Sequence, residues 1–345
     1  FYIAERFHIP RREYADYCAW VASSLPSCRF SSRVAELRWS DERRVWTVIT
    51  ADGARRDARN VVLGVGTQPV LPDALSAVAS EAPGRVYHAG EHLWRVPGLA
   101  AAGARQVAVV GSGQSGAEVF LDLVRRQRET GWSVTWVTRT PSFAPLDYSK
   151  LVLEHTTPEY MRYFHALPAG ARDGLIASQW QLYKGIDTET IDQIHSELYD
   201  HMLDGDRPPV RLLPGVALES AGGAAGGITL GCRHRDLDRR FSLEVDAVVA
   251  ATGYAAQRPS FLEPVAHLID WDASGRYQID VDHRVRTDPA VTGGLYVQNA
   301  ELHTHGAAAP DLGIAAYRSG MILNGVAGRE LFRLPKRTAF QTFAP

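Results

Sequence analysis

The sequence has 345 residues, of which 45% are hydrophobic and 22% are charged, and its formal net charge is -2. These values are typical of a globular protein with two domains and a large buried core, and they exclude a global field that would recruit nucleic acid or acidic membranes. No apolar run approaches the 18 residues that predict a membrane-spanning helix.

The cysteines indicate the redox state of the cellular compartment, and the first residues indicate whether the sequence is part of a longer protein. Cys18, Cys28 and Cys232 form no Cys-x-x-Cys pair, which argues against a disulfide framework and against a dithiol redox site. We therefore expect a reducing, cytoplasmic location. The chain starts at Phe1 without a signal-peptide pattern. Because its first residues read like the middle of a domain, we expect it to be part of a longer protein.

The first third of the chain predicts one helix and several strands. The helix follows Pro10, and apolar residues from Tyr14 to Leu25 recur at helical spacing on one face. Strands are expected over 33–39 and 45–50. Residues 60–69 read as a buried strand that runs into a glycine–proline loop.

A strand–helix–strand unit is predicted in the middle of the chain. Residues 106–110 and 132–138 are short apolar strands, and the helix between them begins near Ser115 and ends near Arg126. Residues 150–203 are expected to be mainly helical.

The C-terminal half predicts strands, loops and one last helix. Residues 222–227, which are four glycines and two alanines, predict a hairpin tip or loop. Strands are expected at 228–233, 241–250 and 294–299, and a helix over 312–327. The segment 246–254 resembles 60–69, and we interpret the pair as two passages of the chain out of a sheet edge.

The strongest local motif is a Gly-x-Gly-x-x-Gly sequence between the first strand and the helix of this unit. In that position Gly111 permits a tight turn, Gly113 lets a pyrophosphate approach the backbone, and Gly116 allows close helix packing. The N–H groups at the helix N-terminus attract phosphate. The alternative is a tight turn without a ligand. The motif residues are Gly111, Ser112, Gly113, Gln114, Ser115 and Gly116.

Arg139 ends the second strand of the unit, where an NAD site usually places Asp or Glu for the ribose hydroxyl. An Arg suits a 2′-phosphate, so the sequence favours NADPH. The alternative is a solvated Arg at the start of a loop.

Two other polar groups have competing interpretations. Arg11, next to Arg12, either faces a cofactor or flanks a helix in water. His303 and His305 lack Cys or carboxylate neighbours at ligand spacing, so no metal is expected, and we expect the turn from His303 to Gly306 to approach a cofactor ring.

Together, several segments resemble the flavin-dependent N-hydroxylating monooxygenases of siderophore biosynthesis, the lysine/ornithine N-monooxygenase family. The resemblance covers the whole chain in the family's order and is strongest for the diamine branch, which acts on cadaverine or putrescine. The segments are FYIAERFHIPRREYADYCAW (1–20), VLGVGTQP (62–69), VAVVGSGQSGAEVFL (107–121), PEY (158–160), YFH (163–165), YKGID (183–187), ATGY (251–254) and NAELHTHG (299–306).

This resemblance implies an α/β fold with two dinucleotide-binding (Rossmann-like) domains, the NADPH domain inserted into a split FAD domain. Residues 1–100 and 246–345 would belong to the FAD domain and 101–245 to the NADPH domain. The family's FAD phosphate segment and its substrate-contacting lysine should precede Phe1. We therefore expect a polypeptide that truly begins at Phe1 to bind flavin poorly and to be inactive.

The resemblance also implies cofactor contacts beyond the glycine motif and Arg139, although no catalytic residue is assigned. Arg11 matches an arginine near the flavin and nicotinamide. The remaining matched positions are Thr252, Gly253, Tyr254, His305, Gly306, Asp311 and Leu312.

The substrate expectation rests on two departures from the ornithine hydroxylases. Where those enzymes carry asparagines that hold the amino-acid head group or nearby cofactor, this chain has Leu153 and Leu182. A buried charged head group needs polar partners, which leucine does not supply. We therefore expect FAD, NADPH and O₂ to be used for N-hydroxylation of cadaverine or putrescine by a cytoplasmic homodimer or tetramer.

Three alternatives stay open at this point. The substrate is L-lysine if another part of the pocket holds a carboxylate. A Baeyer–Villiger or sulfide-oxidising flavin monooxygenase would use the same cofactors, although residues 86–94 miss the spacing of that fingerprint. A non-catalytic nucleotide-binding module is the alternative from a different class.

Overall fold

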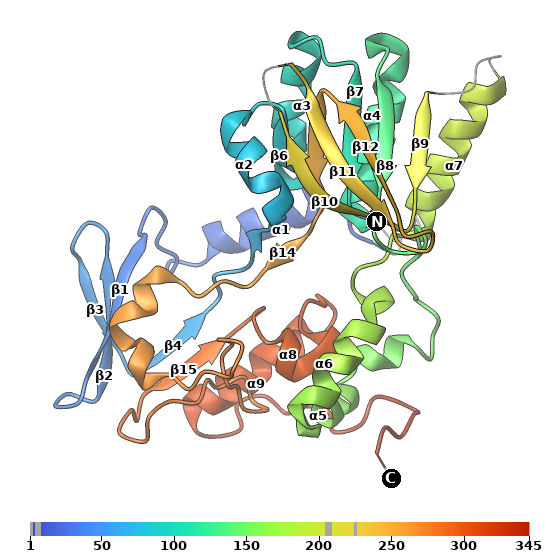
Figure 1. Cartoon of the computed structure of the whole chain (residues 1–345). Coiled ribbons are helices and arrows are strands. Elements are labelled where there is room, and N and C mark those ends of the chain that lie inside the picture. The colour runs from blue at the N-terminus through green and yellow to red at the C-terminus, as the bar shows by residue number, and fades with distance from the viewer. Residues whose placement is uncertain (1–2, 4–7, 204–208, 224–225, 345) are drawn as a thin grey trace. The chain divides into compact units, whose positions relative to one another are not determined.

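The computed structural model describes residues 3, 8–203, 209–223 and 226–344 (Figure 1). The chain divides into two compact units. Unit 1 comprises Phe1–Val61, Arg258–Ile269 and Thr287–Gly294, and unit 2 comprises Val62–Gln257, Asp270–Arg286 and Leu295–Pro345. No helix in the described ranges is long and apolar enough to cross a membrane.

Unit 1 contains a helix, a three-stranded antiparallel sheet and a 3₁₀ helix that packs on β1. Trp46 is fully buried, and its ring meets Trp39 edge-on at 5.0 Å between centroids. The predicted helix is confirmed, but none of its residues is buried, so its apolar face is exposed. The elements are α1 (Arg11–Ser24), β1 (Val34–Ser40), β2 (Val45–Thr50), β3 (Arg55–Ala58) and η5 (Ser260–Leu268).

Unit 2 is built around a five-stranded parallel sheet with the order β6-β13-β7-β8-β9. The predicted α/β class and the strand–helix–strand unit are confirmed. The strands are β6 (Val86–His88), β13 (Ala247–Ala250), β7 (Gln106–Val110), β8 (Ser133–Val137) and β9 (Val210–Leu213).

Both faces of this sheet are covered, which explains why its strands read as continuous apolar runs. Val107 and Val109 point to one core cluster, which includes residues of α3 (His92–Ala101), α4 (Gln114–Thr130) and α7 (Thr188–Leu203). Ala108 and Val110 point to the other. That cluster includes α2 (Asp73–Glu81) and an antiparallel sheet of β10 (Val216–Gly222), β11 (Ile228–His234) and β12 (Arg239–Val245).

The described residues form further helices and strands outside these sheets and their covering helices. The helices are η2 (Ala89–Glu91), η3 (Leu153–Thr156), α5 (Pro158–Ala166), α6 (Ala169–Ser178), η4 (Trp180–Leu182), α8 (Leu302–His305), η6 (Gly306–Ala308) and α9 (Ala315–Ala327). Two strand pairs complete the structure, namely β4 (Asn60–Leu63) with β15 (Gly294–Val297) and β5 (Gln68–Pro69) with β14 (Tyr254–Ala255).

Several sequence expectations need correction. Residues 241–250 are two strands, because the Asp246 carboxylate between them accepts the backbone N–H groups of Arg105 and Gln106 at 2.7 and 2.8 Å. β13 is a central strand, so 246–254 does not leave a sheet edge. The last helix starts at Ala315, and residues 302–305 are helical rather than a turn. The expected tip at 222–227 includes residues 224–225, which lie outside the described residues.

Candidate cofactor-binding site

The glycine turn joins the end of β7 to the start of α4. Gly111 has φ +121°, and a Cβ there would lie 2.1 Å from the Ala251 carbonyl oxygen. A Cβ on Gly116 would lie 2.5 Å from the Gly111 carbonyl oxygen. The loops after β7 and β13 therefore meet backbone to backbone, which only glycine permits.

The N-terminus of α4 is suited to an anion. Gly113 is the N-cap residue and no side chain caps the helix, so the first N–H groups of this 17-residue helix have no side-chain acceptor there. The Gly111 N–H bonds the Val137 carbonyl at 2.9 Å, which fixes the turn against β8. These features fit the pyrophosphate of a dinucleotide.

The side chains of Ser112, Ser115 and Gln114 differ in their hydrogen bonds and burial. The Ser112 hydroxyl accepts a hydrogen bond from Thr140 at 2.9 Å, and Ser115 is half-buried. The Gln114 amide is engaged elsewhere, because its oxygen accepts the Asp187 N–H at 2.8 Å and its nitrogen donates to Thr190 at 3.0 Å. Gln114 therefore ties the segment before α7 to the glycine turn.

Arg139 lies near this turn, although β8 ends two residues earlier, at Val137, than the sequence suggested. Its side chain is exposed, and its guanidinium has no hydrogen-bond acceptor or carboxylate partner in the described part of the chain. Its backbone carbonyl accepts a hydrogen bond from Arg235 at 3.3 Å. The arrangement leaves the Arg139 charge available to an anionic ligand.

The Thr252–Tyr254 loop follows β13, next to the glycine turn. Thr252 donates its hydroxyl proton to the Val70 carbonyl, and the Gly253 carbonyl accepts the Val70 N–H at 3.0 Å. His88, which was not predicted from the sequence, lies beside this loop: its Nδ1 accepts the Gly90 N–H at 3.1 Å and its Nε2 lies 3.0 Å from the Gly253 carbonyl. Since Nδ1 accepts, Nε2 carries the proton and donates it. Burial, the largest cause, lowers the pKa of His88, which favours this neutral form.

A buried cluster of charged side chains contacts the backbone of the His305–Leu312 segment. Glu301 is completely buried, and its carboxylate lies 3.0 Å from the Arg318 guanidinium and 3.5 Å from Nδ1 of His283. Arg318 also donates to the Ala309 carbonyl at 2.5 Å. This cluster was not predicted from the sequence, although Glu301 and Arg318 are charged residues among mainly apolar neighbours, a pattern that can indicate a buried ion pair.

His305 stacks on His283 at 4.1 Å between ring centroids and is fully buried. Burial and the neighbouring histidines His283 and His165 hold the pKa of His305 well below its ordinary value. Gly306 is buried, Asp311 is half-buried and Leu312 is exposed. Within the described ranges, no group of three or more His, Cys, Asp or Glu is arranged to hold a metal ion.

The two leucines lie in separate 3₁₀ helices and are both half-buried. Leu153 is in η3, which packs against α5 and η6. Leu182 is in η4, and the residue before η4, Gln179, accepts the Tyr160 hydroxyl of α5 at 2.8 Å. The η3 helix and the residue that precedes η4 therefore both contact α5.

Two features belong to unit 1. Arg11 is the first residue of α1 and is exposed.

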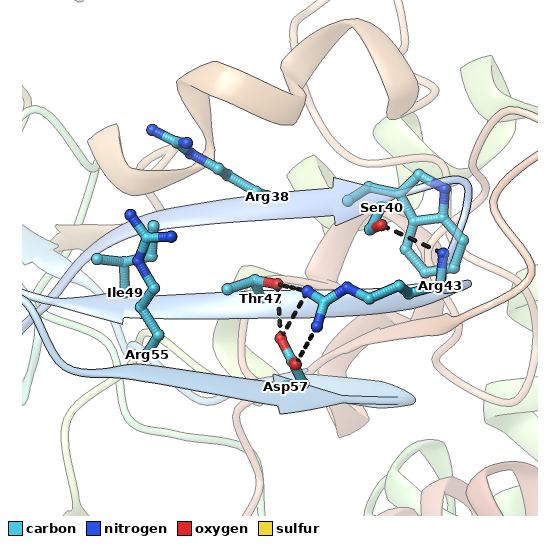
Figure 2. Close-up of a pocket in the computed structure, with 8 residues that line it drawn as sticks. Arg38, Ser40, Arg43, Thr47, Ile49, Arg55 and Asp57 are labelled. Atoms are coloured by element: carbon cyan, nitrogen blue, oxygen red, sulfur yellow. Dashed lines mark hydrogen bonds and ion pairs between the residues drawn. The ribbon is translucent and has the colours of Figure 1, made fainter.

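A pocket of about 460 Å³ lies on the three-stranded sheet, where Arg43 pairs with Asp57 at 2.6 Å (Figure 2). It contains none of the predicted cofactor or substrate residues.

Comparison with known proteins identifies the family. The profile described as L-lysine 6-monooxygenase/L-ornithine 5-monooxygenase matches residues 1–256. The chain belongs to this family. It is 37% identical over 352 residues to a putrescine N-hydroxylase of Shewanella oneidensis, covering 100% of this chain and 68% of that protein. The family resemblance drawn from the sequence is confirmed.

Solved structures of family members agree. The FAD-bound cadaverine monooxygenase of the desferrioxamine pathway of Erwinia amylovora is 38% identical, with a TM-score of 0.92, covering 100% of this chain and 79% of that one. The ornithine N-hydroxylase KtzI of Kutzneria, with reduced FAD, NADP⁺ and L-ornithine, is 25% identical, with a TM-score of 0.84, covering 95% and 79%. Family members are flavin-dependent N-monooxygenases, so the expected enzyme class and cofactors are confirmed.

Proposed function

We propose that this enzyme N-hydroxylates one primary amine of cadaverine or putrescine with FAD, NADPH and O₂, in hydroxamate siderophore biosynthesis. The observation that carries the proposal is the identity, over the whole chain, to a putrescine N-hydroxylase and to a cadaverine monooxygenase. The leucines at 153 and 182 agree with it, because neither offers a partner to an α-carboxylate.

The chain's own residues would bind the cofactors and orient them. The glycine turn and the N-terminus of α4 would hold the NADPH pyrophosphate, and Arg139 its 2′-phosphate. Thr252–Tyr254 and His305–Leu312 would face the flavin, and Arg11 stays a predicted cofactor contact. When bound, FAD supplies the redox and oxygen-activating chemistry, while the protein orients the amine and excludes water.

The amine has to react as the neutral base. A free alkylammonium has a pKa of about 10.4, so the site must favour the uncharged form by desolvation or by a proton acceptor. Half-buried Leu153 and Leu182 would supply part of that desolvation.

The domain division is part of the proposal. Residues 101–245 would form the NADPH domain, and 1–100 and 246–345 the FAD domain. In this division, two strands of the parallel sheet lie outside residues 101–245: β6 belongs to the segment 1–100 and β13 to the segment 246–345. We further propose that the enzyme works in the cytoplasm as a homodimer or tetramer.

L-Lysine is the second candidate substrate, because the family description names lysine and ornithine hydroxylation. Binding of L-lysine would require a residue other than Leu153 and Leu182 to pair with the α-carboxylate of the substrate.

The reaction class is tested by product analysis with the holoenzyme, NADPH and O₂. The proposal expects a hydroxylamine from cadaverine or putrescine, and no ester from ketones or sulfoxide from sulfides. An oxygenated ketone or sulfide product without any hydroxylamine would contradict it.

Arg139→Ala is expected to raise the KM for NADPH by roughly tenfold or more while changing the KM for NADH little. The lost charge-assisted contact to the 2′-phosphate is worth about 1.5–3 kcal/mol. Steady-state kinetics with both nucleotides measures this. Arg211→Ala on β9 is the matched control, since Arg211 is also exposed. Equal effects of Arg139→Ala on both nucleotides would rule out the 2′-phosphate role.

A further inference from the structure

A second cation lies close to Arg139. The Lys184 ammonium lies 5.2 Å from the centre of the Tyr183 ring. Desolvation and then repulsion from the positive charge of Arg139 lower the pKa of Lys184, whose side chain as a whole is exposed. Within the described residues, neither side chain has a carboxylate or another hydrogen-bond acceptor. Arg235, which donates to the Arg139 carbonyl, adds a third positive charge.

Lys184 lies on a segment that is fastened over the glycine turn. Its carbonyl oxygen is 3.4 Å from the position of a Cβ on Gly113, and the Asp187 N–H bonds Gln114 at 2.8 Å. A Cβ on Gly185 would lie 2.5 Å from the Leu146 backbone nitrogen, so the segment also packs tightly on its other side. These contacts fix the backbone of Lys184 beside the predicted phosphate site.

We propose that Lys184 contacts a phosphate group of NADPH together with Arg139. This inference rests on the proposed NADPH site and adds to it a residue from the segment before α7. Two unpaired cations near one another are unfavourable, and an anion between them removes the repulsion and gains two charge-assisted contacts. Lys184 is thus a determinant of nucleotide affinity that the glycine motif alone does not reveal.

The phosphate is either the 2′-phosphate or the pyrophosphate, and binding experiments separate them. Calorimetry on the holoenzyme uses NADP⁺, NAD⁺ and adenosine 2′,5′-bisphosphate, with Lys184→Met, Lys184→Arg and a control, Lys150→Met, at an exposed position. Lys184→Met is expected to weaken NADP⁺ binding roughly tenfold to a hundredfold. Lys184→Arg should retain most of the affinity and Lys150→Met all of it.

The pattern of losses identifies the contact. A loss confined to NADP⁺ and the bisphosphate assigns Lys184 to the 2′-phosphate, whereas an equal loss for NAD⁺ assigns it to the pyrophosphate. NADP⁺ binding by Lys184→Met within twofold of the unmodified enzyme would overturn the inference and leave the proposed function intact. Failure of the unmodified enzyme to bind NADP⁺ would overturn both.

A second measurement separates contact from a structural role. Because an anion favours the charged form of Lys184, NADP⁺ binding should take up protons at about pH 9–10, where lysine begins to lose its proton. Calorimetry in two buffers with different ionisation enthalpies measures this uptake. It should be present in the unmodified enzyme and absent in Lys184→Met. Equal uptake by both proteins would contradict direct contact.

Discussion

Arg318→Met is expected to lower the free energy of unfolding by about 3–5 kcal/mol, because it leaves a buried carboxylate without its counter-ion. Glu301 is completely buried, and Arg318 lies 3.0 Å from it and is only 8% exposed. The change also removes the donor to the Ala309 carbonyl. Chemical denaturation of the holoenzyme measures the loss.

The double variant Glu301→Gln/Arg318→Met is the control for this explanation. With both charges removed, the uncompensated carboxylate is gone, so the double variant should be more stable than Arg318→Met alone. A single variant within 1 kcal/mol of the unmodified protein would contradict a buried ion pair. A double variant less stable than the single one would show that side-chain packing, not charge, is what Arg318 supplies.

Gly111→Ala is expected to cost roughly 3–5 kcal/mol of stability. A φ of +121° is strained for alanine, and its Cβ would lie 2.1 Å from a backbone oxygen that cannot rotate away. The β7 and β13 loops would have to separate, which would disturb the predicted phosphate site as well. Thermal or chemical denaturation, read together with NADP⁺ affinity, measures both effects.

Gly113→Ala provides the comparison within the same turn. Gly113 has φ -83°, and its Cβ would make an ordinary contact at 3.4 Å with the Lys184 carbonyl oxygen. We expect a stability change below about 1 kcal/mol but weaker NADP⁺ binding, because the methyl group would stand where the pyrophosphate approaches. Equal destabilisation by the two alanines would show that the turn is not strained as described.

Local patterns predicted the central part of the fold well. Residues adjacent in the sequence are enough to predict three of its parts: the strand at 106–110, the glycine motif and the strand that ends near Arg139. The split at Asp246 was not predictable in this way, because its carboxylate caps backbone N–H groups of residues 105 and 106, far away in sequence.

Contacts between distant segments also explain which site residues the sequence missed. Glu301, Arg318 and His283 come from three separate stretches, and only the folded chain brings them together. His88 and Lys184 each occur within a motif-like stretch, but nothing local predicts the hydrogen bond of His88 to the Gly253 carbonyl or the effect of the Arg139 charge on the pKa of Lys184. These relations depend on the tertiary structure, so periodicity in the sequence does not predict them.

Whether the substrate is a diamine is measured by kcat/KM of the holoenzyme for cadaverine, putrescine, L-lysine and L-ornithine, with the hydroxylamine product as the readout. NADPH consumption is unsuitable, because uncoupled turnover also oxidises NADPH. Cadaverine and putrescine differ by one methylene, which typically changes discrimination by roughly tenfold or more, so one diamine should exceed the other. Both should exceed L-lysine, with L-ornithine last. The highest hydroxylamine yield from lysine or ornithine would contradict the assignment and the interpretation of Leu153 and Leu182.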